Sequence, residues 1–233
     1  MLFVRSVALE ASISRSHLPA ALHALTQRPL KLRAPVTILS GDNGAGKSTL
    51  LEAIARAMGF HGRGGPRGML VTQTHETQDV HDYLRISRGG SPRDGYFLRG
   101  ETHLDIARTY RDDIEGAPDL LARSHGESVM HILRHRCGGD GLYIFDEPED
   151  GLSVLRQLEA LGIIATLARA GSQVLMATHS PILLAVPDAQ IVELTSTGIR
   201  AQSYEQTQAV RDAREFLSDP EGTAEFLSAE EEP

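Results

Sequence analysis

The nine residues GDNGAGKST, from Gly41 to Thr49, have the types and the spacing of a phosphate-binding loop. They satisfy the pattern G-x-x-x-x-G-K-[ST], with an apolar run before them and a helix-like period after them. Glycines in such a loop let backbone N–H groups turn inward around phosphate oxygens, and the helix N-terminus adds partial positive charge. We expect Lys47 to reach the β- and γ-phosphates and the Ser48 hydroxyl to hold Mg²⁺. The predicted nucleotide-binding residues of this loop are Gly41, Asp42, Asn43, Gly44, Ala45, Gly46, Lys47, Ser48 and Thr49.

A second group of reactive residues ends the run GLYIFDEPED, from Gly141 to Asp150. Four apolar residues carry the chain to the expected edge of a sheet, where Asp146 is placed to bind the water shell of Mg²⁺. Glu147 then lies beside the γ-phosphate, where a carboxylate can act on the attacking water as a general base or positioning group. A plain turn is the alternative, but a glycine-rich loop about one hundred residues upstream favours the phosphate site.

His179, in VLMATHSPILL, follows an apolar run and precedes a proline that ends it. Its imidazole is therefore expected at the same sheet edge, where it would hydrogen-bond the γ-phosphate and report its presence. The predicted catalytic residues are thus Glu147, His179 and Lys47.

The stretch SHGES, from Ser124 to Ser128, has two interpretations. Ser124 followed by Glu127 just ahead of an apolar period fits a capping box, so this is the expected start of a helix. A capped helix N-terminus is also an anion site, which would give Ser124 and the Gly126 N–H a role toward a phosphate.

These residues need strands and helices to position them. Helices are predicted from about Lys47 to Met58 and from about Ser153 to Ala170. The second one has an apolar row of the kind that faces a core, at Val154, Leu155, Leu158, Leu161 and Ile164. Buried strands are predicted at LFVRSVAL, PVTILSG, MLVTQ, GLYIFD, SQVLMAT and AQIVEL, with a hairpin turn from Thr195 to Gly198. The alternation predicts an α/β fold with a mostly parallel central sheet covered by helices.

Composition limits the classes of protein. The chain has 233 residues, 41% of them hydrophobic, and one cysteine, Cys137, so no internal disulfide can form and a reducing, cytoplasmic location is expected. No apolar run approaches the roughly 20 residues of a membrane helix. The net charge of −8 argues against a general nucleic-acid surface. Nine acidic residues and two arginines between Ala201 and Pro233 account for most of that charge.

We expect one domain over residues 1–233, with an inserted lobe at about residues 59–135 and an acidic tail at 218–233. The lobe is rich in glycine and arginine. Its interleaved acids predict at most weak, salt-sensitive DNA binding. The arginines concerned are Arg63, Arg67, Arg85, Arg88 and Arg93.

Taken together, GDNGAGKST, YIFDEP, ATHSP and the serine–glycine pair in SHGES resemble the ATP-binding-cassette (ABC) class of P-loop ATPases, in that class's order. The resemblance covers almost the whole chain. It implies ATP and Mg²⁺ as ligands, an ABC-type domain with an antiparallel β portion and a small inserted helical lobe, and a head-to-tail homodimer. In that dimer, Ser124 and Gly126 of one copy would face the γ-phosphate in the P-loop of the other, while Glu127 caps the helix.

Details within the resemblance separate members of the class. Transporters usually carry LSGGQ, whereas this chain has RSHGE, with His125 in place of a glycine. SHGE and DEPE look more like small stand-alone bacterial ATPases, related to chromosome-maintenance and repair heads. The chain also has Ser153 where the class usually has the D-loop aspartate, which puts coupling through that carboxylate in doubt.

Other residues are assigned only through the resemblance. Gln73 fits best as the Q-loop glutamine and a further Mg²⁺ ligand, so the predicted metal set is Ser48, Asp146 and Gln73; Gln78 is the rival. Arg15 and His17 are candidates for contact with adenine, because no tyrosine precedes the P-loop at a convincing place.

The sequence leaves the partner open. A stand-alone ATPase whose ATP-driven dimerisation acts on an unknown protein is favoured over the ATP-binding subunit of a membrane transporter. A small-molecule kinase would leave Glu147, His179 and SHGES without roles. His131, His135 and Cys137 have part of a zinc-ligand spacing, but a polar helix face is favoured because no complementary ligand pair is evident.

Overall fold

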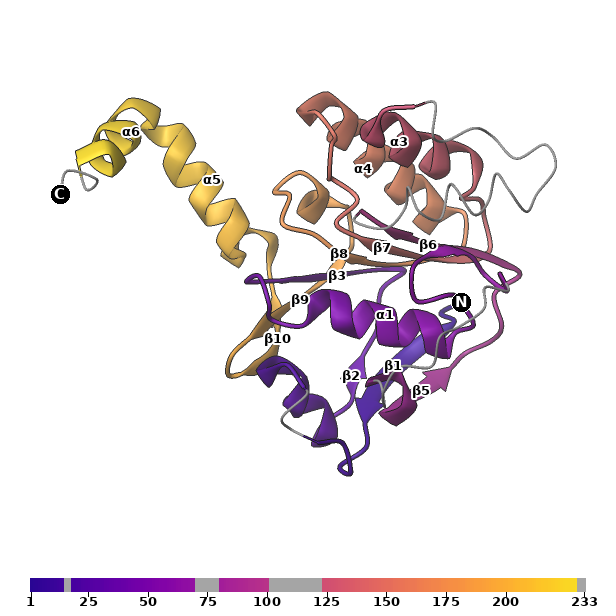
Figure 1. Ribbon diagram of the computed structural model, residues 1–233. Helices are drawn as coiled ribbons and strands as arrows, with labels where there is room; N and C mark the ends of the chain where they lie inside the picture. The colour runs from indigo at the N-terminus through magenta and orange to yellow at the C-terminus, as the bar shows by residue number, and fades with distance from the viewer. Residues whose placement is uncertain (15–17, 70–79, 101–122, 230–233) are drawn as a thin grey trace.

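The computed structural model describes residues 1–14, 18–69, 80–100 and 123–229, which form two sheets and the helices around them (Figure 1). A three-stranded antiparallel sheet has the order β2-β1-β5, with β1 at Val4–Leu9, β2 at Leu30–Lys31 and β5 at Leu84–Arg88. A seven-stranded sheet has the order β10-β9-β3-β8-β7-β6-β4. Its strands are β3 (Val36–Gly41), β4 (Gly65–Pro66), β6 (Asp94–Arg99), β7 (Gly141–Asp146), β8 (Gln173–Ala177), β9 (Gln190–Thr195) and β10 (Gly198–Gln202).

The five central strands of the large sheet are parallel, as the sequence predicts. Strands β9, β3, β8, β7 and β6 pair in parallel, and only β10 and β4 run antiparallel at the two edges. Every residue of β7 and β8 is buried, which explains their continuous apolar sequences. The strand predicted at MLVTQ lies almost wholly outside the described residues.

Alternate residues of the central strands feed two cores. Leu142 and Ile144 of β7 pack with α1 (Lys47–Ala57) and the small sheet, whereas Tyr143 and Phe145 pack with α3 (His125–His135) and α4 (Val154–Arg169). Figure 1 shows the same layers, with α1 and the small sheet on one side of the large sheet and α3 and α4 on the other. The buried Gln173 side chain joins the sheets by accepting hydrogen bonds from the N–H groups of Phe3 and Val4, both at 2.8 Å.

Both predicted helices are confirmed, but the apolar row predicted on the second was wrong over its first turns. Val154, Leu155 and Leu158 are 63%, 77% and 51% exposed. Positions spaced by three advance by about 300°, so such a row turns about 60° around the helix at each step. Only its far end therefore reaches the core, where Ile164 is buried and Leu161 is partly buried. The buried face is formed by Ala160, Ile164 and Leu167.

The segment predicted as an inserted lobe, residues 59–135, contributes to both sheets. Its described part includes β5, which pairs with β1, and β6, which pairs with β7. The short 3-10 helix η3 (Val80–Tyr83) precedes β5. The segment is therefore tied into the two sheets at β5 and β6, and the domain boundaries given above stay predictions.

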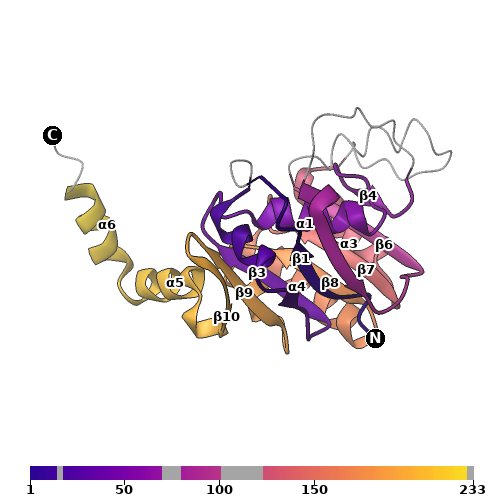
Figure 2. The ribbon, with the colours of Figure 1, turned by 90° about the horizontal axis from the view of Figure 1, so that it is seen from below.

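The chain ends in a projecting helical arm. The predicted hairpin between β9 and β10 is confirmed, with Gly198 opposite Thr195. After the 3-10 helix η5 (Tyr204–Gln206), α5 (Gln208–Ser218) and α6 (Pro220–Ala229) extend away from the body in both views (Figures 1 and 2). Helix α6 falls inside the segment that the sequence marked only as an acidic tail. Among the described residues, no helix has the length and apolar character to cross a membrane.

Candidate functional site

The glycine-rich loop lies between β3 and α1, as predicted. Gly41, Gly44 and Gly46 have φ values of 125°, 76° and 98°, which side chains rarely tolerate. A Cβ on Gly46 would come within 2.7 Å of the Pro19 Cβ, whereas one on Gly44 would meet nothing within 4 Å. Glycine is thus required at position 46 by both packing and backbone conformation, and at position 44 by backbone conformation alone. These positive φ values give the loop the curvature it needs to surround an anion.

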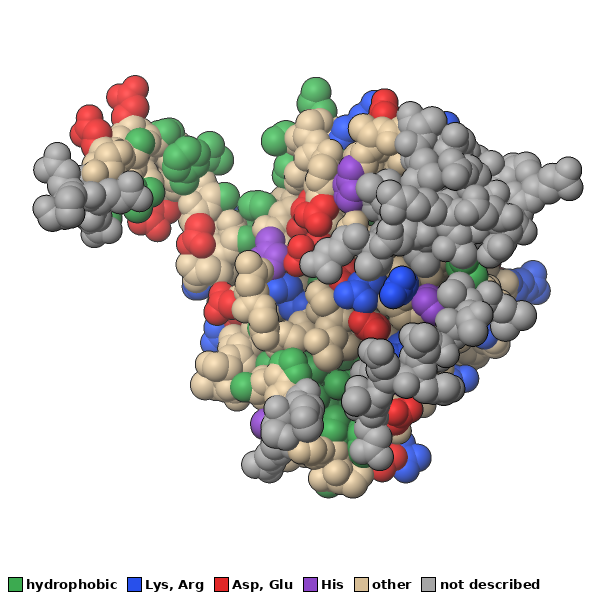
Figure 3. Space-filling model, viewed as in Figure 1, with side chains coloured by type: hydrophobic (Ala, Val, Ile, Leu, Met, Phe, Trp, Pro, Cys, Tyr) green, Lys and Arg blue, Asp and Glu red, His purple; other side chains and the backbone are tan. Residues whose placement is uncertain are grey.

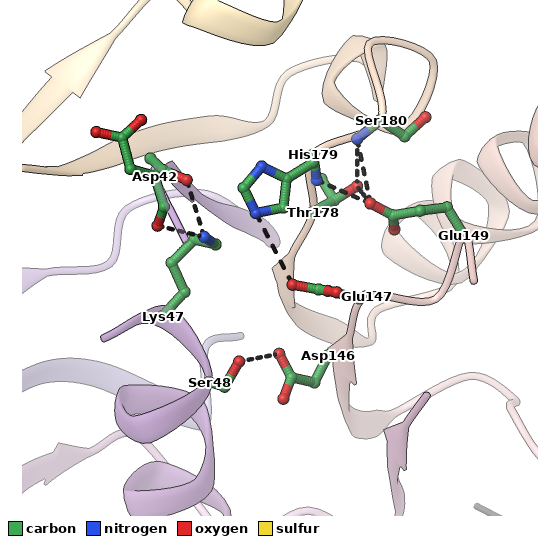
Figure 4. Close-up of polar contacts among 10 residues, drawn as sticks. Asp42, Lys47, Ser48, Asp146, Glu147, Glu149, Thr178, His179 and Ser180 are labelled. Atoms are coloured by element: carbon green, nitrogen blue, oxygen red, sulfur yellow. Dashed lines mark hydrogen bonds and ion pairs between the residues drawn. The ribbon is translucent and has the colours of Figure 1, made fainter. Parts of the chain in front are cut away.

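Lys47 closes this loop from within (Figure 4). Its side chain is buried at the start of α1, and Nζ donates to the carbonyl oxygens of Gly41 at 2.8 Å and Asp42 at 2.9 Å. Burial lowers the pKa of the ammonium, and the nearby Glu147 and Asp146 carboxylates oppose that shift. In the absence of a nucleotide, the two loop carbonyls are therefore the hydrogen-bond acceptors of the ammonium.

Ser48 and Asp146 meet at the edge where β7 ends. The Ser48 Oγ donates to the Asp146 Oδ1 at 2.9 Å, and the other carboxylate oxygen, Oδ2, is 3.7 Å from the Nε of Arg99. Arg99 lies directly opposite Asp146 in the β6–β7 pair and also contacts Glu52 at 2.6 Å. A hydroxyl and a carboxylate beside a phosphate loop are oxygen ligands of the kind Mg²⁺ prefers, so this pair fits that ion.

Arg99 is a site residue that the sequence reasoning missed. With Ser48, Asp146 and Glu147 it lines a small cavity of about 90 Å³ beside the loop. The signal was its position as the last residue of the strand DGYFLR, but the sequence alone did not show that this strand is adjacent to GLYIFD.

Glu147 and His179 are brought together above the loop (Figure 4). The Glu147 Oε1 is 3.8 Å from the Nε2 of His179, and both side chains are about two-fifths exposed, at 38% and 39%. Glu147 has φ 52°, a left-handed conformation that is uncommon outside glycine, and its N–H donates to the Ala177 carbonyl at 3.0 Å. Strained backbone of this kind persists only where the surrounding structure holds it in place, and it is concentrated at functional sites.

A cleft of about 580 Å³ joins these groups. Its lining includes Asp42 and Asn43 of the loop, together with Glu147 and His179. The start of α5, at Gln208, closes one side of it. The first three predicted loop residues, 41–43, thus face one space with two of the predicted catalytic residues, Glu147 and His179.

Glu149 is a second residue that the sequence reasoning passed over. Its Oε1 accepts hydrogen bonds from Thr178 Oγ1 at 2.6 Å, His179 N at 2.8 Å and Ser180 N at 3.1 Å. One carboxylate oxygen therefore fixes the backbone that carries His179 (Figure 4). The third acid of DEPED was its only sequence signal, and its partners lie about thirty residues away, at a separation that local motifs do not reveal.

Replacement of Glu149 by glutamine should change how stability depends on pH. Burial raises the pKa of the Glu149 carboxyl, so the folded state holds this proton more tightly than the unfolded state. The resulting stabilisation is complete below the ordinary glutamate pKa of about 4.3 and is lost as pH rises through the folded-state pKa. Glutamine keeps an acceptor oxygen without titrating. The melting temperature of Glu149→Gln should therefore rise relative to that of the parent as the pH increases above the ordinary glutamate pKa of about 4.3, and a pH-independent difference would contradict this.

SHGES starts α3 with the predicted capping box, which is confirmed. The Glu127 N–H donates to Ser124 Oγ at 3.3 Å, and the Ser124 N–H donates to Glu127 Oε2 at 2.8 Å. Gly126 also has a packing role, because a Cβ there would come within 2.4 Å of the Gly151 carbonyl oxygen. Ser124 and Gly126 line neither the 90 Å³ cavity nor the 580 Å³ cleft. The structure does not bring them to the loop of their own chain.

The remaining candidates contribute less to this site. Gln73 and Gln78, and Arg15 and His17, lie outside the described residues. Ser153 caps α4 by accepting a hydrogen bond from the Arg156 N–H at 3.4 Å. Within the described ranges, no cluster of three or more His, Cys, Asp or Glu side chains is arranged to hold a metal ion.

Comparisons with known proteins agree with this geometry. The family described as "AAA domain" matches residues 15–117, and "AAA domain, putative AbiEii toxin, Type IV TA system" matches residues 129–185. The ABC transporter ATP-binding/permease protein Rv1747 of Mycobacterium tuberculosis is 30% identical over 203 residues, which cover 75% of this chain and 22% of that protein. The ribose import ATP-binding protein RbsA 1 of Streptomyces coelicolor is 27% identical over 184 residues, covering 68% and 36%.

A solved structure described as "An inward-facing conformation of a putative metal-chelate type ABC transporter" has the same fold. It aligns with a TM-score of 0.53 at 16% identity, covering 91% of this chain and 88% of the other. The chain spans only about a fifth to a third of the two curated relatives, at 22% and 36% of their lengths.

The phosphate-binding loop, placed between the first strand of a mostly parallel sheet and a helix, defines a P-loop nucleoside triphosphatase domain. Its relatives and its fold then identify the class of P-loop ATPase. The chain belongs to the ATP-binding-cassette class of ATPases.

Proposed function

We propose that the chain binds ATP with Mg²⁺, hydrolyses it to ADP and phosphate, and does so as a head-to-tail dimer of two copies. The observation that carries this proposal is the convergence of Lys47, the Ser48–Asp146 pair and the Glu147–His179 pair on one edge of the sheet. A binding loop, an oxygen-ligand pair and a candidate base at one edge are what phosphoryl transfer to water requires.

Binding begins with an exchange of partners at Lys47. In the structure its ammonium donates to two loop carbonyls, Gly41 O and Asp42 O. A β- or γ-phosphate oxygen offers a stronger, charge-assisted acceptor to the same three N–H donors. Ser48 and Asp146 would hold Mg²⁺, whose charge offsets that of the phosphates when it is bound.

Glu147 then orients and deprotonates the attacking water. Its side chain faces the cleft, and its strained backbone is anchored to the Ala177 carbonyl. His179 lies 3.8 Å from the same carboxylate, so it can donate to the γ-phosphate while staying beside Glu147. Glu149 holds the loop that carries His179, which makes it a positioning residue.

The second copy would supply the N-terminus of α3, the helix that starts at SHGES. The N-terminus of α3 carries exposed Ser124 and does not line the cleft of its own chain. A two-fold arrangement would set it over the γ-phosphate of the other copy, where the N–H groups of its first turn and its dipole favour an anion. This role of Ser124 and Gly126 is supported by the class to which the chain belongs.

Replacement of Lys47 by alanine should weaken MgATP binding about 10- to 100-fold, because a hydrogen bond to a charged group contributes roughly 1.5–3 kcal/mol. Calorimetry of nucleotide binding measures the change. Lys31→Ala is the matched control, since Lys31 is the other lysine of the chain and lies in β2. Equal affinity in Lys47→Ala and Lys31→Ala would reject the phosphate site.

A second candidate function is the ATP-binding subunit of a membrane transporter. It is favoured by the two relatives, whose names describe an ABC transporter and a ribose importer. Purification of the tagged chain in the presence of ATP separates the two functions. A co-purified membrane permease would support the transporter subunit, and a soluble partner or none would support the stand-alone ATPase.

Binding of nucleic acid should be weak. Arg85 pairs with Glu10 at 2.8 Å, and Arg93 lies 3.7 Å from Asp140. Arg67 and Arg88 donate to the carbonyl oxygens of Met58 and Ala57. Since these guanidinium groups already have partners, we expect DNA binding that disappears between about 50 and 200 mM salt. Fluorescence anisotropy with a labelled duplex tests this, and retention at high salt would contradict it.

A further inference from the structure

Two surfaces of the molecule expose large apolar side chains. The first, the α4 patch, consists of Val154, Leu155 and Leu158, which are 63%, 77% and 51% exposed. The second is the C-terminal arm, residues 208–229. Its exposed apolar side chains are Phe216 at 50%, Leu217 at 72%, Phe226 at 63% and Leu227 at 57%. Figure 3 shows hydrophobic side chains along the arm and at the crest of the body over α4. Grouped apolar exposure of this kind marks an interaction surface.

The arm starts at the nucleotide cleft. Gln208, Ala209 and Asp212 of α5 line the same 580 Å³ space as Asn43 and His179. Val210 is buried in the core and fixes this first turn to the body. The rest of α5 and α6, 11 and 10 residues long, therefore extends outward from a fixed point beside the P-loop.

The α4 patch starts beside α3. Gly126 packs so closely on Gly151 that a Cβ would come within 2.4 Å of its carbonyl oxygen, and α4 begins three residues later. The pKa of Glu127 is lowered mainly by hydrogen bonds from Ser124, and Arg156, next to Leu155 of the patch, is near enough to lower it further. Whatever approaches Ser124 thus also approaches the α4 patch.

In the proposed dimer these two surfaces would lie close to each other. There, Ser124 of one copy lies over the P-loop of the other. The α4 patch of the first copy then comes to the root of the arm of the second. A helix of 11 residues spans about 16 Å, so α5 is long enough to cross the first turns of a neighbouring α4.

The charges of the two surfaces are complementary. Between Gln208 and Ala229 the arm carries two arginines, Arg211 and Arg214, against five acidic residues: Asp212, Glu215, Asp219, Glu221 and Glu225. Beside the α4 patch, Arg134 and Arg156 share Glu159, and Arg123 and Arg156 lie near Glu127, so three arginines stand against two glutamates there. An acidic, apolar arm therefore meets an apolar surface with a small excess of arginine, which favours this pairing and disfavours arm against arm.

We propose that ATP-driven closure packs the C-terminal arm of each copy onto the α4 patch of the other copy. The contact is made twice in a two-fold dimer, and it would add apolar burial to an interface otherwise built around the nucleotides. This inference rests on the head-to-tail dimer proposed above.

The test uses cysteines placed on different copies. In a Cys137→Ala, Glu147→Gln background, one tagged copy carries Phe216→Cys and a differently tagged copy carries Leu155→Cys. After mixing and mild oxidation, a disulfide-linked heterodimer is expected with MgATP and not without it. The matched control replaces Leu155→Cys by Ser196→Cys, at an exposed position in the turn between β9 and β10, and should give no cross-link.

The outcomes separate this inference from the proposed function. If the Glu147→Gln background forms no ATP-dependent dimer in light scattering, both fail. If it dimerises but the 216–155 pair gives no more cross-link than the control, only the arm contact is rejected. A cross-link within single chains that carry both cysteines, formed without ATP, would show that the arm folds onto its own α4, and it would also overturn the proposal.

A second measurement does not depend on oxidation. Leu155→Glu sets a negative charge against the acidic arm, whereas Leu155→Arg offers it a partner. The dissociation constant of the ATP-bound Glu147→Gln dimer should be lower by about tenfold or more with Leu155→Arg than with Leu155→Glu. ATP binding by each monomer should be equal in both variants. Equal dimer affinities would reject the arm contact.

Discussion

Replacement of Glu147 by glutamine should lower ATP turnover by about 10²- to 10⁴-fold, the usual effect of losing a general base. Glutamine preserves the size and an acceptor oxygen, but it cannot take a proton from water. Nucleotide binding should persist, because Lys47 and the glycine loop are unchanged. Phosphate release and calorimetry on the same preparation measure the two effects separately.

The control for this variant is Glu10→Gln, which also replaces a carboxylate but lies on the small sheet side, paired with Arg85. It should hydrolyse ATP at the parent rate. If Glu147→Gln retained more than a tenth of the parent turnover, Glu147 would not be the base, and another group at the cleft would have to activate water.

The second large effect concerns the dimer. Glu147→Gln should trap ATP between two copies, because a ligand that binds the dimer better than the monomer shifts the population toward the dimer. Adding Ser124→Arg should abolish that ATP-dependent dimer, since a bulky side chain at the N-terminus of α3 would block its approach to the γ-phosphate. Light scattering with and without MgATP reports the change.

Two further measurements make this result specific. ATP affinity of the Glu147→Gln, Ser124→Arg monomer should equal that of Glu147→Gln alone, because Ser124 does not line its own cleft. Glu147→Gln with Ser196→Arg, an equal change at an exposed turn, should still dimerise. A double variant with Ser124→Arg that dimerises normally on ATP would leave SHGES as a helix cap only.

The sequence predicted the parts of the site that depend on contiguous residues. GDNGAGKST, the end of GLYIFD and the His179 turn each follow a buried strand, and parallel strands bring their carboxyl ends to one edge of a sheet. Arg99 and Glu149 escaped prediction because their roles arise from pairing between distant segments. Arg99 gains its place only through the register of β6 on β7, and Glu149 only through three donors in the segment that follows β8.

The sequence also predicted the central strands and the two main helices of the fold, but not every helix or the direction in which each one faces. Strands that are buried on both faces have a continuous apolar sequence, and both main helices have clear starts. The direction in which a helix faces was harder, as Leu155 and Leu158 show, because an apolar row does not state which neighbour it meets. The helix α6 could not be inferred from a segment whose main signal was its negative charge.

Lys47 gives the unliganded loop a definite shape. By donating to Gly41 O and Asp42 O, its ammonium holds the loop backbone in a conformation that a nucleotide would otherwise have to induce when it binds. Ordering a residue costs about 1–2 kcal/mol of conformational entropy, and here folding has already met that cost. The loop is therefore preorganised, so association should be limited by diffusion and by release of two hydrogen bonds rather than by a slow loop closure.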